Sequence, residues 1–320
     1  MEIADILKCR CCMDIFPEDI SLAQPLYMAL MLKYHPDRCS EPGAAEASAV
    51  INELYGKLKK AHSFQEKIFR CRDRAIGIKY LMALKQEYGM EYVGESNVYF
   101  LIENDFADCF IRSEAKSDFF FREYLPHQIL AQADVFLPFV TNAINTEEGM
   151  LVETCKRPEE LPLTRILDFY GGHIDSRHAA WIISRLLGIC CYAEAKGIVW
   201  NCLAEENLFI NPTEHTVRVG GGWWFAAREG GRMTGVQSSV FDSMPGTDGT
   251  AQHINDLECV KALARRILPD DAPDAVKRYA DGICSGSATE EMEKWEDTII
   301  AGFGGRRFTQ MNVRLPDIAG

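Results

Sequence analysis

The clearest hydrophobic pattern lies near the N-terminus, where two apolar runs flank a short polar stretch. Residues 26–32 form an apolar run with helical character. Proline cannot continue a helix, so this run should end before Pro36. Residues 44–61 then place apolar side chains at helical spacing along one side. The pattern predicts two antiparallel helices joined by a tight loop that contains His35 and Asp37.

The segments around these two helices also show helical patterns. Residues 2–8 predict a short first helix, and Ser21 can cap the helix that follows it. Residues 63–88 combine helical spacing of apolar side chains with an excess of basic residues. We therefore expect an all-α domain over residues 1–62 and a helical connector over residues 63–88.

The pattern changes after the connector, where β-branched and aromatic residues dominate. Two runs separated by a short polar turn predict a hairpin of residues 98–102 and 109–111. Further segments predict a helix at 116–133, strands at 135–140 and 149–153, a long helix at 176–196 and a strand at 216–219. Strands first and helices second are typical of an α+β domain with two lobes, here over residues 89–311. The tail of residues 312–320 should be loose.

Composition and charge narrow the class of protein. The chain has 320 residues, of which 47% are apolar, so it can form a real core. Its net charge is −13, and the acidic excess lies beyond the connector. Nucleic-acid contacts need clustered basic residues, so we expect no nucleic-acid partner. No apolar run reaches the roughly 18 residues of a membrane span, and the acidic N-terminus does not look like a secretory signal. These features predict a cytoplasmic protein with no membrane partner.

The twelve cysteines are scattered along the chain and should be reduced in the cytosol. Cys9, Cys11, Cys12 and Cys39 could form a zinc site, but they lack the usual spacing of two cysteine pairs. Buried or surface thiols are the alternative. We predict no metal and leave the zinc site as an open alternative.

The N-terminal region resembles the J-domain of DnaJ-type co-chaperones. The likeness includes the loop tripeptide His35-Pro36-Asp37 and also the residues that recur in this family on both sides of the loop. Those recurring residues are here Tyr27, Leu30, Lys33, Tyr34, Ile51, Asn52, Tyr55 and Leu58. The resemblance implies a DnaK-class chaperone ATPase as partner. It also implies that this partner is contacted by His35, Pro36 and Asp37, together with the neighbouring Lys33 and Arg38.

One departure from the J-domain pattern concerns the second helix. J-domains usually carry a basic pair midway along this helix, which meets an acidic surface of the ATPase. Here those positions hold Met28 and Ala29. Charge pairs mainly speed and orient association, so their loss should weaken or redirect docking. Exposed methionines would offer an adaptable apolar contact instead.

The second domain resembles the protein-kinase fold. A long helix leads into residues 197–210, where the H-R-D positions of the kinase catalytic loop hold Trp200, Asn201 and Cys202. Asn207 matches the metal-binding asparagine of that motif. The D-F-G position is filled by glycines around Gly221, followed by two tryptophans that could plug the vacated pocket.

Other kinase parts are also altered. The glycine-rich loop is reduced to residues 94–97, the strand-three lysine aligns with Arg112, and its helix partner would be Glu123. Phosphoryl transfer needs one aspartate to accept a proton and another to hold magnesium, and both are missing. The resemblance therefore implies a pseudokinase without catalytic residues or cofactor, in which Asp256 keeps a structural role by capping backbone amides of the catalytic-loop region.

Two functions from different classes follow. The first is a non-enzymatic co-chaperone or adaptor that engages a DnaK-class ATPase through its loop and holds a client or second protein on the kinase-like domain. The alternative is a divergent ATP-dependent phosphotransferase or nucleotidyltransferase that uses Glu205, Glu206 and Asn207 with a metal. Solvated acids and a loop-capping asparagine are the simpler interpretation of these three residues.

Overall fold

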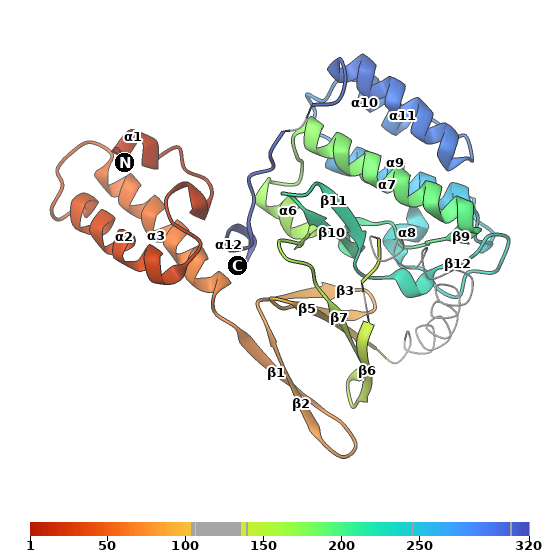
Figure 1. Cartoon of the computed structure of the whole chain (residues 1–320), viewed down its shortest axis with the longest axis horizontal. Helices are drawn as coiled ribbons and strands as arrows, with labels where there is room; N and C mark the ends of the chain where they lie inside the picture. Colours follow the sequence, from red (N-terminus) through yellow and green to blue (C-terminus); the bar gives the residue numbers. More distant parts are fainter. Residues whose placement is uncertain (104–105, 107–135, 139, 245, 308, 320) are drawn as a thin grey trace.

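The computed structural model describes residues 1–103, 106, 136–138, 140–244, 246–307 and 309–319. It contains a small helical domain, a β-rich lobe and a helical lobe (Figure 1). No helix in these ranges is both long and apolar enough to cross a bilayer. The expected Arg112, Glu123, the strand at 109–111 and the helix at 116–133 all lie outside the described residues.

The N-terminal domain contains the expected helical hairpin. It consists of α1 (Ile3–Ile6), η1 (Cys12–Asp14), α2 (Ile20–Tyr34) and α3 (Ala44–Ala61). The rings of Tyr27 and Tyr55 stack 4.0 Å apart, and Tyr27 Oη donates to Asn52 Oδ1 over 2.8 Å, which joins α2 to α3. The N-cap of α2 differs from the expected Ser21. It is Asp19, whose carboxylate accepts from the Ser21 N–H, because an acceptor before the first turn satisfies a free backbone donor.

The predicted helical connector over residues 63–88 is wrong. This segment forms the antiparallel hairpin of β1 (Gln65–Arg70) and β2 (Ala75–Tyr80), followed by β3 (Met82–Gln86). The apolar positions fit a period of two as well as a helical one. Burial of Phe69 and Ile78 against Tyr92 of the neighbouring sheet selects the strand, because pairing and packing override weak local propensity.

The β-rich lobe is built on one antiparallel sheet. Its strands are β3, β4 (Gly89–Val93), β5 (Asn97–Ile102), β6 (Val140–Thr146) and β7 (Gly149–Cys155), in the order β3-β4-β5-β7-β6. The predicted strands at 98–102 and 149–153 are confirmed. The strand predicted at 135–140 instead begins at Val140, where pairing with Thr154 starts.

The helical lobe follows the sheet and carries the largest part of the core. Its strands and short helices are β8 (Leu161–Pro162), β9 (Ile198–Val199), η2 (Glu205–Asn207), β10 (Leu208–Asn211), β11 (Thr216–Val219), η3 (Trp223–Phe225) and β12 (Ala227–Arg228). Its α-helices are α6 (Leu163–Phe169), α7 (Ser176–Lys196), α8 (Ser238–Asp242), α9 (His253–Ile267), α10 (Asp274–Asp281) and α11 (Ala288–Phe303). The predicted long helix at 176–196 and the strand at 216–219 have the expected bounds.

The C-terminal tail is packed against the molecule, so the expectation of a loose tail at 312–320 is wrong. Its helix α12 (Leu315–Ile318) lies beside α3 and α6, as Figure 1 shows for the C-terminus. An Asp317 carboxylate oxygen accepts the backbone N–H of Cys12 over 2.7 Å. Val313 and Ile318 are buried, and this apolar burial holds the tail in place.

Candidate functional site

The loop at the end of α2 presents its tripeptide to solvent. Pro36 and Asp37 are exposed and His35 is half-buried. The His35 carbonyl accepts the backbone N–H groups of Arg38 and Cys39, both over 2.9 Å, and His35 Nδ1 accepts the Asp37 N–H over 3.2 Å. These bonds order the loop from within, so its side chains are available to another protein.

The residues beside the tripeptide are oriented by the same helical hairpin. The Lys33 ammonium lies 3.7 Å from a Glu2 carboxylate oxygen and 4.8 Å from the ring centroid of Tyr34. Tyr34 is buried and donates to the Met1 carbonyl over 2.6 Å. Arg38 is exposed at the far end of the loop. The structure therefore brings all five predicted contact residues to one end of the N-terminal domain.

The outer face of α2 is apolar. Met28 is 55% exposed, and large apolar side chains also lie exposed at Leu22, Leu26 and Leu32. The opposite face packs Ala23, Leu30 and Tyr34 into the core. Exposed apolar patches of this kind are typical of surfaces that contact other proteins.

Aromatic side chains pack around the segment that the sequence aligns with the D-F-G position of kinases. Tyr88, Phe100 and Trp224 are fully buried. The ring of Trp224 lies 5.0 Å from that of Tyr88 and 5.6 Å from that of Phe100, in edge-on contact with both. Trp224 belongs to η3, immediately after the glycines at the D-F-G position. The expectation that the two tryptophans plug a vacated nucleotide pocket stays a prediction.

Asn207 is used for backbone contacts. Its Nδ2 donates to the Cys202 carbonyl over 2.9 Å and also to Gln237 Oε1. Its own carbonyl accepts the N–H groups of Gly220 and Gly221. Cys202 is buried, which raises the pKa of its thiol well above the ordinary value. Asn207 thus has the geometry of a loop-capping residue.

Glycine is required where this loop contacts Asn207. A Cβ added at Gly222 would lie 2.8 Å from Asn207 Nδ2, and Gly222 has φ +67°. A Cβ at Gly221 would lie 2.9 Å from the Tyr88 hydroxyl. Close approach therefore explains glycine at these positions without any phosphate ligand.

Asp256 has the structural role expected of it. Its two carboxylate oxygens accept the backbone N–H groups of Trp200 and Asn201, over 2.7 and 3.0 Å. Asn201 adopts φ +54°, a left-handed conformation that these bonds help to hold. Burial raises the pKa of Asp256 to about 7, although the two N–H donors lower it.

The adjacent acids Glu205 and Glu206 face different segments. Glu205 Oε2 lies 3.3 Å from Arg266 Nε on α9, whereas Glu206 Oε1 accepts the Ser239 hydroxyl on α8. Burial raises the pKa of Glu205, and the Arg266 guanidinium opposes this change. The two carboxylates are thus held by separate protein partners.

Metal-ligating side chains do not gather at any of these positions. Within the described ranges, no group of three or more His, Cys, Asp or Glu residues is placed to hold a metal ion. Burial and the nearby Asp317 carboxylate raise the pKa of Cys11 to about 12, which keeps this thiol protonated. The Cys11 thiol donates to the Asn312 carbonyl over 3.1 Å, and the Cys12 thiol donates to the Leu54 carbonyl over 3.3 Å.

The turn between β3 and β4 makes contacts that the sequence did not reveal. Residues 94–97 were expected as the reduced glycine-rich loop; residues 94–96 form the turn between β4 and β5, and Asn97 begins β5. The turn between β3 and β4 instead contacts the helical lobe: Glu87 carboxylate oxygens accept from Ser238 N (2.7 Å) and Ser238 Oγ (3.1 Å). Gln86 donates to the Glu206 carbonyl over 3.2 Å. This turn therefore ties the two lobes together.

Glu91 is a buried acid in the same sheet. Its Oε2 accepts from Gln86 Nε2 over 3.0 Å, and its Oε1 has no hydrogen-bond partner among the described residues. Burial raises the pKa of Glu91 to about 8, with Gln86 opposing the change. Its contribution to stability is present below about pH 4.5 and is lost as the pH rises towards 8.

Glu91→Gln is expected to reduce the loss of stability between acidic and mildly alkaline pH. Each unit of pKa shift corresponds to about 1.4 kcal/mol, so the variant should be more stable than the wild type by a few kcal/mol at about pH 8. Urea unfolding at about pH 5 and about pH 8 measures this. Glu95→Gln makes the same change at a solvent-exposed position and is the control. If the stability of all three proteins depended equally on pH, the raised pKa of Glu91 would be contradicted.

Comparisons with known proteins identify the fold of the larger domain. No protein-family model matches the chain, and no curated protein matches it in sequence. The solved structure of vaccinia related kinase 3 is 13% identical with a TM-score of 0.51, and the match covers 83% of this chain and 99% of that one. The BubR1 kinase domain is 9% identical with a TM-score of 0.49, covering 73% of this chain and 82% of that one.

The similarity to vaccinia related kinase 3 supports a two-lobed, protein-kinase-like α+β fold. At such low identity it supports the fold alone. A kinase fold implies a magnesium-bound nucleotide between the lobes, but the side chains here do not fit one. Cys202 and Gly221 supply no carboxylate, and Tyr88 and Trp224 occupy the space beside them. The J-domain resemblance of the N-terminal region stays a prediction.

Proposed function

We propose that this protein is a non-enzymatic co-chaperone or adaptor of the cytosol. Its N-terminal domain engages a DnaK-class chaperone ATPase through His35, Pro36 and Asp37. Its kinase-like domain is a pseudokinase that holds a client or a second protein. The tripeptide acts by contact, biasing the chaperone towards its hydrolysing state, and performs no chemistry of its own.

The observation that carries the proposal is the exposed, internally ordered loop beside an apolar helix face. A loop that is held by its own hydrogen bonds loses little entropy when it binds. Lys33 and Arg38 supply basic charge at the same end of the domain, where an acidic surface of the partner would dock. The exposed Met28 and Leu32 add an apolar contact that replaces the missing basic pair.

The proposal predicts nucleotide-dependent binding to a DnaK-class chaperone. The full chain, immobilised on a biosensor, should bind the ATP-bound chaperone more tightly than the ADP-bound form. His35→Gln should weaken this binding by roughly tenfold or more, because interface energy concentrates in a few central residues. His173→Gln makes the same change at an exposed position of the helical lobe and should have no effect. Equal binding by all three proteins would remove the loop from the mechanism.

The alternative enzyme reading makes a different prediction. A ligand that binds only the folded state raises stability by RT ln(1 + [L]/Kd). We expect no increase in Tm when the chain is titrated with ATP and magnesium or manganese, because aromatic side chains fill the cleft. An increase that is lost in Asn207→Ala would instead support a divergent phosphotransferase or nucleotidyltransferase using Glu205, Glu206 and Asn207.

A further inference from the structure

A small cavity in the helical lobe lies among α7, the end of α11 and the turn between β10 and β11. Its volume is about 120 Å³. Trp181 of α7 and Ile299 and Phe303 of α11 line its apolar wall. Arginine side chains also line it: Arg177, Arg185, Arg306 and Arg307. We call this feature the arginine-rimmed pocket.

Local structure explains why these side chains meet. Arg177, Trp181 and Arg185 are four residues apart along α7 and so share one face of that helix. Helix α11 ends at Gly304, whose φ of +68° lets the chain reverse direction. This reversal brings Arg306 and Arg307 back to the face where Phe303 lies.

The charge of the pocket is largely uncompensated. The Arg177 guanidinium lies 4.9 Å from the Phe303 ring centroid, and Arg185 Nε donates to the His215 carbonyl over 2.9 Å. Arg306 pairs with Glu296. In the described part of the chain, no carboxylate forms an ion pair with Arg177, Arg185 or Arg307. In a protein of net charge −13, this is a site where an anion is attracted.

The wall of the pocket offers aromatic contact. The rings of Trp181 and His215 lie 4.8 Å apart. The buried Trp181 Nε1 has no hydrogen-bond partner among the described residues. Burial, together with the Arg185 charge, lowers the pKa of His215, so this ring is a neutral part of the wall.

Size and chemistry together limit the ligand. Small-molecule sites usually measure about 300–1,000 Å³, so this cavity is too small for a nucleotide or similar ligand. A cavity of about 150 Å³ accommodates benzene, so about 120 Å³ suits a single side chain. Arginine guanidinium groups match carboxylates in bidentate geometry. These properties fit an apolar anchor presented by a chain that carries acidic residues beside it.

We propose that the arginine-rimmed pocket binds an acidic protein segment by taking up one of its aromatic side chains. The aromatic ring packs between Trp181 and Phe303, and the flanking carboxylates pair with Arg185 and Arg307. This inference deepens the proposed function, since it gives the kinase-like domain a place and a chemistry for its second partner.

Fluorescence anisotropy with the full chain tests the proposal. The probe is a fluorescein-labelled peptide, Asp-Glu-Asp-Phe-Asp-Glu-Asp, and a matched peptide has Ala in place of Phe. We expect the Phe peptide to bind roughly tenfold more tightly than the Ala peptide. Arg185→Ala combined with Arg307→Ala should weaken binding of the Phe peptide by roughly tenfold or more.

The control carries the same change of charge elsewhere. Arg72→Ala combined with Arg74→Ala alters two exposed arginines of the β1–β2 turn and should leave binding unchanged. Equal binding of the two peptides, equal loss in both double variants, or no binding at about 1 mM chain would each overturn the proposal. The comparison of the two peptides uses only the wild-type protein, so it does not depend on whether a variant folds. Failure here would leave chaperone binding through His35 unaffected, so the two proposals are tested separately.

Discussion

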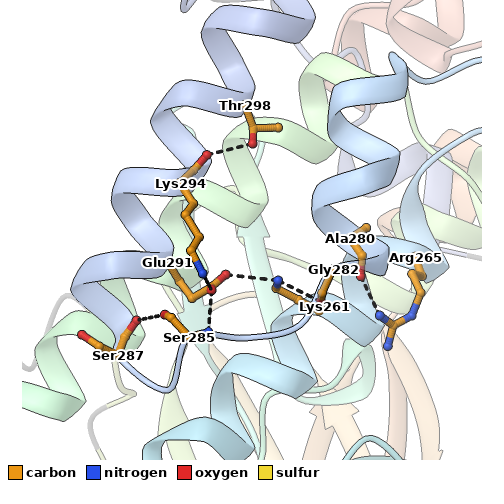
Figure 2. Close-up of polar contacts among 9 residues, drawn as sticks. All are labelled: Lys261, Arg265, Ala280, Gly282, Ser285, Ser287, Glu291, Lys294 and Thr298. Carbon is orange, nitrogen blue, oxygen red and sulfur yellow. Dashed lines mark hydrogen bonds and ion pairs between the residues drawn. The ribbon is translucent and has the colours of Figure 1, made fainter.

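Glu291→Gln is expected to lower the free energy of unfolding by about 3–5 kcal/mol, because it leaves a buried ammonium without its counter-ion. Glu291 is 0% exposed and Lys261 2% exposed, and Glu291 Oε2 lies 3.2 Å from Lys261 Nζ. Figure 2 shows how this pair joins α9 to the first turn of α11, with Lys261 also donating to the Gly282 carbonyl over 3.0 Å. Glutamine keeps an acceptor for the Ser285 N–H, so the variant isolates the charge.

Urea unfolding of the variant against wild type measures the effect, and Glu293→Gln, exposed on the same helix, is the control. That control should change stability by less than about 1 kcal/mol. Burial alone would raise the pKa of Glu291, but the Ser285 N–H, Lys294 and Lys261 lower it. Its contribution is therefore present above the unfolded pKa and lost as the pH falls through the folded one. A loss equal to that of the control would show that the pair is not important.

Asp256→Ala is the second large effect that we expect. It leaves the buried N–H groups of Trp200 and Asn201 without acceptors, at a cost of about 1–3 kcal/mol each. The left-handed conformation of Asn201 also loses its support. Hydrogen exchange at these two amides should become faster, and urea unfolding should show the lower stability.

An asparagine variant and a surface control make the test of Asp256 more specific. Asp256→Asn keeps one carbonyl acceptor and cannot ionise, so it should lose less stability than the alanine variant. Burial raises the pKa of Asp256 to about 7, so the wild type loses stability as the pH rises through this value while the asparagine variant does not. Asp297→Ala, exposed on α11, should be nearly neutral. Asparagine and alanine variants of equal stability would contradict the capping role.

Local sequence patterns predicted those parts of the structure that depend on nearby residues. The helix at 176–196 was recognisable because its apolar spacing continues without a break until Gly197, which adopts φ +63° as its cap. Asp256 could be assigned because a motif resemblance placed it beside a loop already located. The loop at His35 follows from Pro36, because the residue before a proline avoids the helical conformation, and His35 has φ −59° and ψ 132°.

Parts that depend on distant partners were missed. Phe69 and Ile78 favour strands only because Tyr92 and Leu101 of another sheet bury them. Tyr88 lies in a two-residue turn, and nothing in its local sequence indicates that its ring would pack against Trp224. The packing of the tail was missed because its contact with Cys12 through Asp317 joins opposite ends of the chain.

The central claim is that this protein stimulates a DnaK-class chaperone through its His35 loop. It is tested most directly by measuring single-turnover ATP hydrolysis by such a chaperone, with and without a saturating concentration of the protein. We predict that the protein alone hydrolyses no ATP. The wild type should accelerate hydrolysis by the chaperone roughly tenfold or more, which corresponds to lowering the barrier by about 1.4 kcal/mol. The His35→Gln variant should not accelerate it. Unchanged hydrolysis across a panel of such chaperones, or equal acceleration by wild type and His35→Gln, would contradict it.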